Sequence, residues 1–214
     1  METKKYIVIT GDISGFTRLP DGGREKLMMN LSAQLSLWVK EKKHAAIFRG
    51  DSFQLLFEDA NQAIQRTIQL RCWLKMNSPK GKRMLDAKMS LGIGEISYLG
   101  KTVLDSDGEA FHLSGRGFES LNEDESWQIV TRNADKNEQL KVIMGLSNIL
   151  IRNWTMNQAE VIYWMLEGKT QQQMAEQLNI AQSAVNNRIK LSKWKEIEKA
   201  IRYVTSLIEK NDAF

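Results

Sequence analysis

The first part of the chain alternates between short apolar runs and longer segments with helical spacing. Residues 6–10 form a continuous, largely β-branched run that stops at a glycine, which is typical of a buried strand. Over residues 25–43 the apolar positions recur every three or four residues, which predicts an amphipathic helix. Two short apolar runs, residues 45–49 and 52–57, flank Gly50-Asp51, and this turn dipeptide predicts a hairpin.

The alternation of strand and helix patterns continues to residue 131. Residues 60–72 carry one apolar face and are followed by Pro79, so a second helix is expected there. Residues 85–93 alternate apolar and polar side chains, which is the period of a half-buried strand. Residues 108–121 predict a third helix, and residues 127–131 predict a further strand. The order βαββαβ followed by αβ predicts an α+β fold built on a ferredoxin-like palm, or split βαβ.

Strand patterns end near residue 133, and helical period continues to residue 209. We therefore predict a palm domain over residues 1–133, a connecting helix over 134–154 and an all-α domain over 155–214. The chain has 214 residues, of which 42% are hydrophobic and 26% charged, a composition typical of folded soluble domains.

Composition excludes several classes of protein. One cysteine, Cys72, excludes a disulfide framework and a zinc site made of several thiolates. Two prolines and no low-complexity tract argue against long disordered linkers. The apolar run after the charged start is too short for a signal peptide or a membrane span. We expect a cytoplasmic protein with no membrane partner.

The formal net charge of +4 is too small to indicate a nucleic-acid partner, but charge is unevenly distributed. Residues 59–83 hold six basic and one acidic side chain, residues 84–133 hold four and nine, and residues 181–195 hold four and none. This pattern is compatible with one part that binds a cation and another that contacts phosphates.

Two aspartates occupy positions where a palm brings chain segments together. Asp12 follows the first predicted strand, and Asp51 lies in the predicted hairpin. Because these strands are adjacent and central in a βαββαβ sheet, both carboxylates are expected at one end of it. Two close carboxylates repel each other unless a hard cation lies between them, and Mg²⁺ prefers oxygen ligands. The alternative is that each aspartate only shapes its own turn.

The residues around these aspartates resemble a known family. GDISGFT at residues 11–17 is similar to the first metal-binding segment of class III nucleotidyl cyclases, and RGDSF at residues 49–53 is similar to their hairpin. Residues 105–116, DSDGEAFHLSGR, are similar to the segment that contacts base and phosphates. Together with LGIGEIS at residues 91–97 and the C-terminal helices, these motifs resemble the SatD family.

The cyclase resemblance implies roles for individual residues. Asp12 and Asp51 match the two metal carboxylates, Asp105 matches the adenine-selecting position, and Arg116 matches an arginine that stabilises charge on the transferring phosphorus. Arg49 is a candidate phosphate contact, although a hairpin arginine is more often solvated. The resemblance therefore implies Mg²⁺ and a nucleotide ligand.

Two positions depart from the cyclase pattern. Ile47 stands where cyclases have a base-recognising lysine, and His112 stands where they have a ribose-orienting asparagine. An apolar side chain cannot hydrogen-bond a purine edge, so we expect little or no cyclisation. His112 remains a candidate nucleotide contact, with a packing or capping histidine as the alternative.

Residues 155–190 have helix-turn-helix spacing. Thr170 is placed to cap a helix, Ala175 is small where two helices cross, and Asn179 tolerates a left-handed turn. The surrounding pattern resembles the tetrahelical module of LuxR-type regulators and of sigma-factor region four. The following helix and the segment after it carry amides, a hydroxyl and cations suited to a DNA major groove: Gln182, Ser183, Asn186, Asn187, Arg188, Lys190 and Lys193.

These features favour a transcriptional regulator that binds double-stranded DNA and carries a cyclase-like sensor for a metal and a nucleotide. One alternative is a nucleotidyl cyclase or related phosphoryl-transfer enzyme with a C-terminal targeting module. Another is a ligand-free dimerisation platform whose helical module docks a protein. Because cyclase-like palms pair face to face, the resemblance also implies a homodimer.

Overall fold

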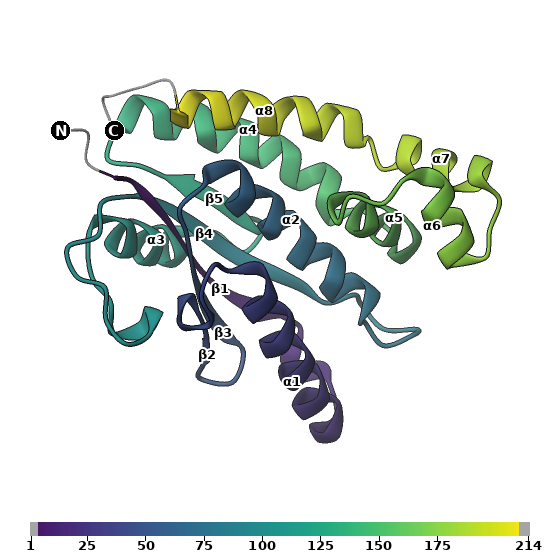
Figure 1. Cartoon of the computed structure of the whole chain (residues 1–214), viewed down its shortest axis with the longest axis horizontal. Helices are drawn as coiled ribbons and strands as arrows, with labels where there is room; N and C mark the ends of the chain where they lie inside the picture. Colours follow the sequence, from purple (N-terminus) through teal and green to yellow (C-terminus); the bar gives the residue numbers. More distant parts are fainter. Residues whose placement is uncertain (1–3, 210–214) are drawn as a thin grey trace.

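The structure is a computed structural model that describes residues 4–209; residues 1–3 of the predicted palm and 210–214 of the predicted all-α domain lie outside this range. The described residues form an α+β fold with one five-stranded mixed sheet and eight α-helices. Figure 1 shows helices α5, α6 and α7 gathered at one end of the molecule, with α4 and α8 running from them alongside the sheet.

The strand order in the sheet is β2-β3-β1-β4-β5. The central strand β1 (Tyr6–Ser14) is antiparallel to both β3 (Ser52–Phe57) and β4 (Asp86–Gly94). β2 (Ala45–Phe48) completes the hairpin with β3, and β5 (Trp127–Val130) lies parallel to β4 at the other edge. The apolar run at residues 52–57 therefore lies directly beside the run at residues 6–10, and the run at residues 45–49 lies beyond it.

The central strand continues past the glycine at which the apolar run stops. Gly11 pairs with Phe53 on one side and Met89 on the other. A Cβ atom on Gly11 would lie 2.6 Å from the carbonyl oxygen of Lys88 and 2.7 Å from the Phe53 ring, so close packing requires the glycine. The prediction that the strand stops at Gly11 is wrong, and Asp12 lies within the strand.

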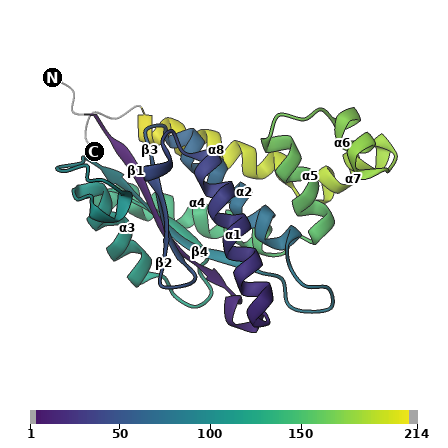
Figure 2. The ribbon, with the colours of Figure 1, turned by 60° about the horizontal axis from the view of Figure 1, so that its bottom comes forward.

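Helices cover both faces of the sheet. On one face, α1 (Asp21–Trp38) and α2 (Ala60–Met76) enclose the main core with Ile7 of β1. On the other face, Val8 packs with α3 (Glu109–Ser120). Figure 2 shows α3 on the opposite side of the sheet from α1 and α2. Because alternate side chains of β1 enter two cores, its apolar run is continuous rather than alternating.

The C-terminal part is helical, as predicted, and consists of α4 (Ala134–Arg152), α5 (Met156–Leu166), α6 (Gln171–Leu178), α7 (Gln182–Leu191) and α8 (Trp194–Glu209). Its buried side chains belong to the same hydrophobic cluster as the core of the sheet. α5 and α8 contact α2, and α4 packs on β5, where the Trp127 indole donates a hydrogen bond to the Met144 carbonyl at 3.2 Å. Packing is thus continuous across the predicted domain boundary.

Three short 3-10 helices connect these elements: η1 (Phe16–Arg18), η2 (Lys42–His44) and η3 (Val103–Asp105). Over residues 4–209, none of the helices combines the length and the hydrophobicity needed to cross a bilayer.

Candidate functional site

The two predicted metal ligands lie on neighbouring segments at one end of the sheet. Asp12 of β1 is paired with Ser52 of β3 and with Lys88 of β4. Asp51 directly precedes Ser52, and its carbonyl oxygen accepts a hydrogen bond from the backbone N–H of Ile13 at 3.1 Å. The hairpin turn is therefore fixed against the end of β1.

The side chain of Asp12 is half-buried, and the nearby Asp51 carboxylate affects its pKa. Burial raises the pKa of Asp12 above its ordinary value, the Asp51 carboxylate raises it further, and Lys88 opposes both effects. The Lys88 ammonium donates instead to the carbonyl oxygen of Leu121 at 3.0 Å. The negative charge of Asp12 is thus only partly compensated within the described chain.

This pair supplies two oxygen ligands of the kind that Mg²⁺ prefers. In the part of the chain that the structure describes, no group of three or more His, Cys, Asp or Glu side chains is arranged to hold a metal ion. Mg²⁺ is commonly held by one or two carboxylates, with water and substrate phosphates completing its octahedron. Two carboxylates such as Asp12 and Asp51 would suffice for that open kind of site, but not for an all-protein cage.

The position that departs most from the cyclase pattern faces away from Asp12. Ile47 pairs with Phe53, whose side chain is buried in the main core, and is itself packed against that core. Asp12 pairs with Ser52, one residue earlier, so its side chain lies on the opposite face of the sheet. An apolar residue at position 47 therefore fits the face covered by α1 and α2, and its side chain does not line the face that carries Asp12.

The other predicted site residues are three nucleotide contacts and the charge-stabilising Arg116, and they lie on three segments of the chain. Arg49 adopts a left-handed turn conformation with φ of 51°, and its guanidinium lies 6.0 Å from the Phe48 ring. Asp105, in η3, accepts a hydrogen bond from the Thr102 hydroxyl at 2.7 Å. The remaining two, His112 and Arg116, lie on α3.

The two residues on α3 are exposed. His112 pairs with Asp107, with 3.0 Å between Nε2 and Oδ1, and 59% of its side chain is exposed, so it is not packed in the core. Arg116 donates to the His112 carbonyl at 3.3 Å. Arg116 also lines a hollow of about 630 Å³ between α3, β5 and α4, shared with Arg132 and Lys141. The contacts of Arg116 therefore place it toward the β5 edge of the sheet, away from Asp12 and Asp51.

A second candidate site is formed by α6, α7 and the turn between them. Thr170 caps α6, because its hydroxyl accepts the Gln173 N–H at 3.2 Å while the Gln173 side chain accepts the Thr170 N–H at 2.9 Å. Asn179 ends α6 in the left-handed conformation with φ of 51°. Both features agree with the sequence prediction, and Ala175 and Val185 are buried between the helices.

The outward face of α7 is polar. Gln182, Ser183, Asn187 and Lys190 are exposed, and Asn186 is half-buried. Lys193, between α7 and α8, is also exposed and has φ of 57°. The Arg188 guanidinium lies 3.3 Å from a carboxylate oxygen of Glu160 on α5. Arg188 therefore ties α7 to α5.

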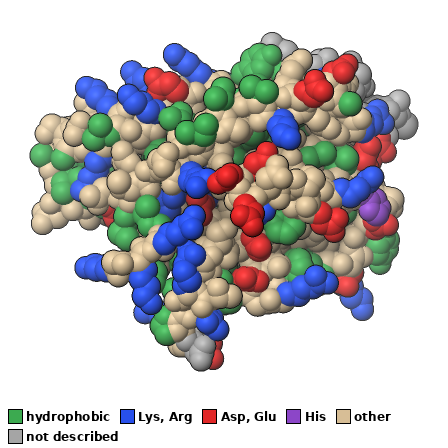
Figure 3. Space-filling view, turned by 180° about the vertical axis from the view of Figure 1, so that it is seen from behind, with side chains coloured by type: hydrophobic (Ala, Val, Ile, Leu, Met, Phe, Trp, Pro, Cys, Tyr) green, Lys and Arg blue, Asp and Glu red, His purple; other side chains and the backbone are tan. Residues whose placement is uncertain are grey.

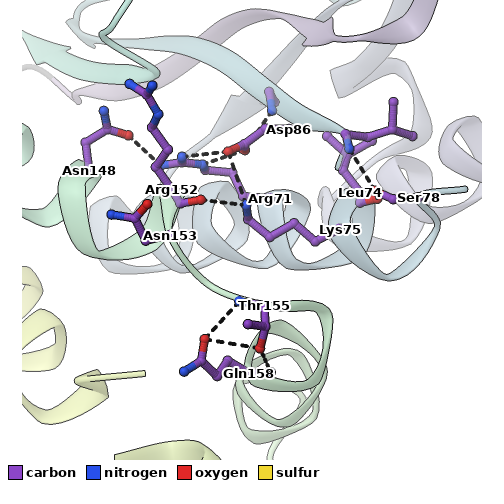
Figure 4. Close-up of polar contacts among 12 residues, drawn as sticks. Arg71, Leu74, Lys75, Ser78, Asp86, Asn148, Arg152, Asn153, Thr155 and Gln158 are labelled. Carbon is purple, nitrogen blue, oxygen red and sulfur yellow. Dashed lines mark hydrogen bonds and ion pairs between the residues drawn. The ribbon is translucent and has the colours of Figure 1, made fainter. Parts of the chain in front are cut away.

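One buried ionic cluster was not predicted from sequence. Arg71 of α2 donates two hydrogen bonds to the Asp86 carboxylate, at 2.7 and 2.8 Å, and a third to Asn148 of α4 at 3.0 Å. The Lys75 ammonium lies 3.6 Å from the same carboxylate (Figure 4). The available signal was the spacing of Arg71 and Lys75, two cations four residues apart on the helix over residues 60–76, which places them on one face.

Comparison with known proteins adds no family to this description, since neither a protein-family model nor a curated protein matches the chain.

Proposed function

We propose that the protein is a DNA-binding transcriptional regulator of the SatD family, located in the cytoplasm, whose sheet carries a Mg²⁺ and nucleotide sensor. The observation that carries the proposal is the exposed amide and hydroxyl face of α7, set after a left-handed turn at the end of a capped helix. Side chains of these types read base edges in a major groove, and neighbouring lysines contact phosphates.

The fold supports both halves of the proposal. The strand order β2-β3-β1-β4 is the order expected of a ferredoxin-like palm, with β5 added beside β4. The four consecutive helices α5 to α8 match the number and order of helices in a tetrahelical DNA-binding module. On the reverse face, Figure 3 shows Asp and Glu side chains mostly over one half, whereas Lys and Arg side chains occur over both halves.

The DNA interface is tested by selecting binding sites from a random pool and titrating binding against salt. Asn187→Ala should weaken binding to the selected sequence by about 1 to 3 kcal/mol, because a base contact is lost. Lys193→Ala should weaken all sequences alike and reduce the salt slope by about one, because a phosphate contact is lost.

The matched control is Asn157→Ala, an exposed asparagine on α5 outside the proposed interface, which should leave DNA binding unchanged. If no sequence is enriched, and the α7 variants bind DNA as the unmodified protein does, the helical module is a protein dock and the regulator proposal fails. A two-fold dimer would show paired half-sites in the selected sequence, whereas a monomer would select a single one.

The sensor is tested at Asp12. Because its pKa is raised, the folded protein holds this proton more tightly than the unfolded chain, so the group favours folding below its folded pKa and opposes it above. Asp12→Asn should therefore raise the melting temperature at pH 7 without Mg²⁺, and should lose the further rise that Mg²⁺ gives the unmodified protein.

Asp135→Asn, at an exposed position in the first turn of α4, is the control and should keep the response to Mg²⁺. An identical Mg²⁺ response in the unmodified protein and in Asp12→Asn would remove the metal site. The enzyme alternative is favoured by the same aspartate pair, and it would replace the sensor if purified protein converted ATP or GTP to a cyclic product that Asp51→Ala abolishes.

A further inference from the structure

A hollow of about 390 Å³ opens where the end of β1, the segment before β4 and the end of α4 meet. Its lining includes neither Asp12 nor Asp51, nor any residue of α7. Four cations from four segments of the chain converge on it, against two carboxylates: Arg18, Lys75, Arg83 and Arg152, with Asp86 and Glu123.

One of the two carboxylates is already compensated. Asp86 accepts two hydrogen bonds from Arg71, which is fully buried, and one from the backbone N–H of Ala87 at 2.9 Å. The other carboxylate, Glu123, is exposed and free to turn toward solvent. The hollow is therefore more positive than the number of its acidic side chains suggests.

The buried lysine is left without a carboxylate of its own. Lys75 is 2% exposed, its ammonium lies 3.6 Å from Asp86, and it donates to the Arg152 carbonyl at 3.2 Å (Figure 4). Arg71 and Lys75 together with Asp86 carry one excess positive charge, and an uncompensated buried charge is unfavourable. An anion in the hollow would supply the missing partner.

We propose that this hollow binds the phosphate group of a small molecule, with Lys75 as its buried contact and Arg83 and Arg18 at its rim. A phosphate monoester carries about −1.5 to −2 charges at neutral pH, which matches the excess of two cations in the lining. Guanidinium groups donate paired hydrogen bonds in a geometry that matches phosphate oxygens. The volume of the hollow is within the range of small-molecule sites.

The rim is able to rearrange around a ligand. Arg152 pairs with Asp124, but 45% and 90% of these two side chains are exposed, and such surface pairs are weak. A bound phosphate would therefore connect Arg83, next to β4, with Arg152, at the end of α4. This inference is independent of the proposed metal and DNA sites, because it uses none of their residues.

The test is the melting temperature of the full chain in inorganic phosphate, and in a second arm in ribose 5-phosphate, against sodium chloride of equal ionic strength. At about 100 times the dissociation constant, binding should raise the melting temperature by about 5 to 10 °C. Lys75→Met and Arg83→Gln should each lose most of this rise. Lys199→Met, at an exposed position on α8, should keep all of it.

The proposal is overturned if phosphate gives no rise in the unmodified protein, or an equal rise in all four proteins, since the latter is a general salt effect. If Lys75→Met does not fold, Arg83→Gln and Arg152→Gln decide the question, because both positions are exposed. A larger rise with ribose 5-phosphate identifies a phosphate monoester as the ligand, and an equal rise in the two arms identifies inorganic phosphate.

Discussion

Replacing Asp86 by alanine is expected to lower the free energy of unfolding by about 3 to 5 kcal/mol, because it leaves two buried cations without their carboxylate. Arg71 and Lys75 are 0% and 2% exposed, so water solvates these two cations poorly once the carboxylate is lost. For a chain of this length, the loss corresponds to a fall in melting temperature of roughly 6 to 20 °C. Denaturant unfolding at pH 7 measures it, and an unchanged slope would show that the effect lies in the folded state.

The dependence of stability on pH checks the same cluster. Burial raises the pKa of Asp86, but the charges and hydrogen bonds of Arg71 and Lys75 outweigh burial and hold the pKa below its ordinary value. A lowered folded pKa contributes stability above the unfolded pKa, and this contribution is lost as pH falls through the folded value. Asp86→Ala should therefore lose less stability than the unmodified protein between about pH 4 and the acid transition.

The control for Asp86→Ala replaces the whole cluster. Arg71→Met, Lys75→Met and Asp86→Leu in one chain remove all three charges, and this variant should recover most of the lost stability. If Asp86→Ala lowers the free energy of unfolding by less than about 1 kcal/mol, the ion pair is solvated, contrary to what the burial of its residues indicates.

The hydrophobic pattern predicted a strand for each of the five strands that the structure describes, because short apolar runs and alternating apolar and polar residues are local features of the sequence. The ends of the helices were harder to predict. The apolar spacing predicts a helix from residue 25, yet α1 starts at Asp21, with the Arg24 N–H bonded to the Pro20 carbonyl at 2.9 Å. At its other end α1 stops at Trp38, five residues before the predicted end, because Val39 turns into an extended conformation and is buried.

The aspartate pair, Arg116 and the Asp86 cluster differ in how far the sequence alone could predict their positions. The neighbourhood of Asp12 and Asp51 follows from strand pairing, which the hairpin dipeptide already indicates. The position of Arg116 depends on how α3 is rotated over the sheet, and this rotation is set by contacts such as Thr10 with Ser114, 2.9 Å between hydroxyl oxygens. The Asp86 cluster joins α2, β4 and α4, whose mutual placement has no local signal.

Replacing Trp154 by alanine is expected to cost about 3 to 5 kcal/mol of stability, because it opens a cavity at the junction of α4 and α5. Trp154 is 2% exposed, and its ring centroid lies 6.3 Å from that of Trp194 at the start of α8. Its indole donates to the Ser192 carbonyl at 2.8 Å, so one side chain holds the beginning of α5 to the end of α7. Trp154→Phe should cost less, since it keeps most of the ring and loses the hydrogen bond.

This substitution also tests whether the predicted domain boundary is an energetic one. Because the main core runs without interruption from the sheet into α4 to α8, Trp154→Ala should lower the midpoint of a single transition, seen alike by far-ultraviolet circular dichroism and by tryptophan fluorescence. Trp164→Phe, at a half-buried position on α5, is the control and should change the midpoint little. Two separated transitions in Trp154→Ala, with the sheet melting at its original temperature, would instead mean that the C-terminal helices fold as an independent unit. A signal from the sheet would then have to reach α7 through contacts between elements, such as those of α2 with α5 and α8 or those of β5 with α4 and of α4 with α8.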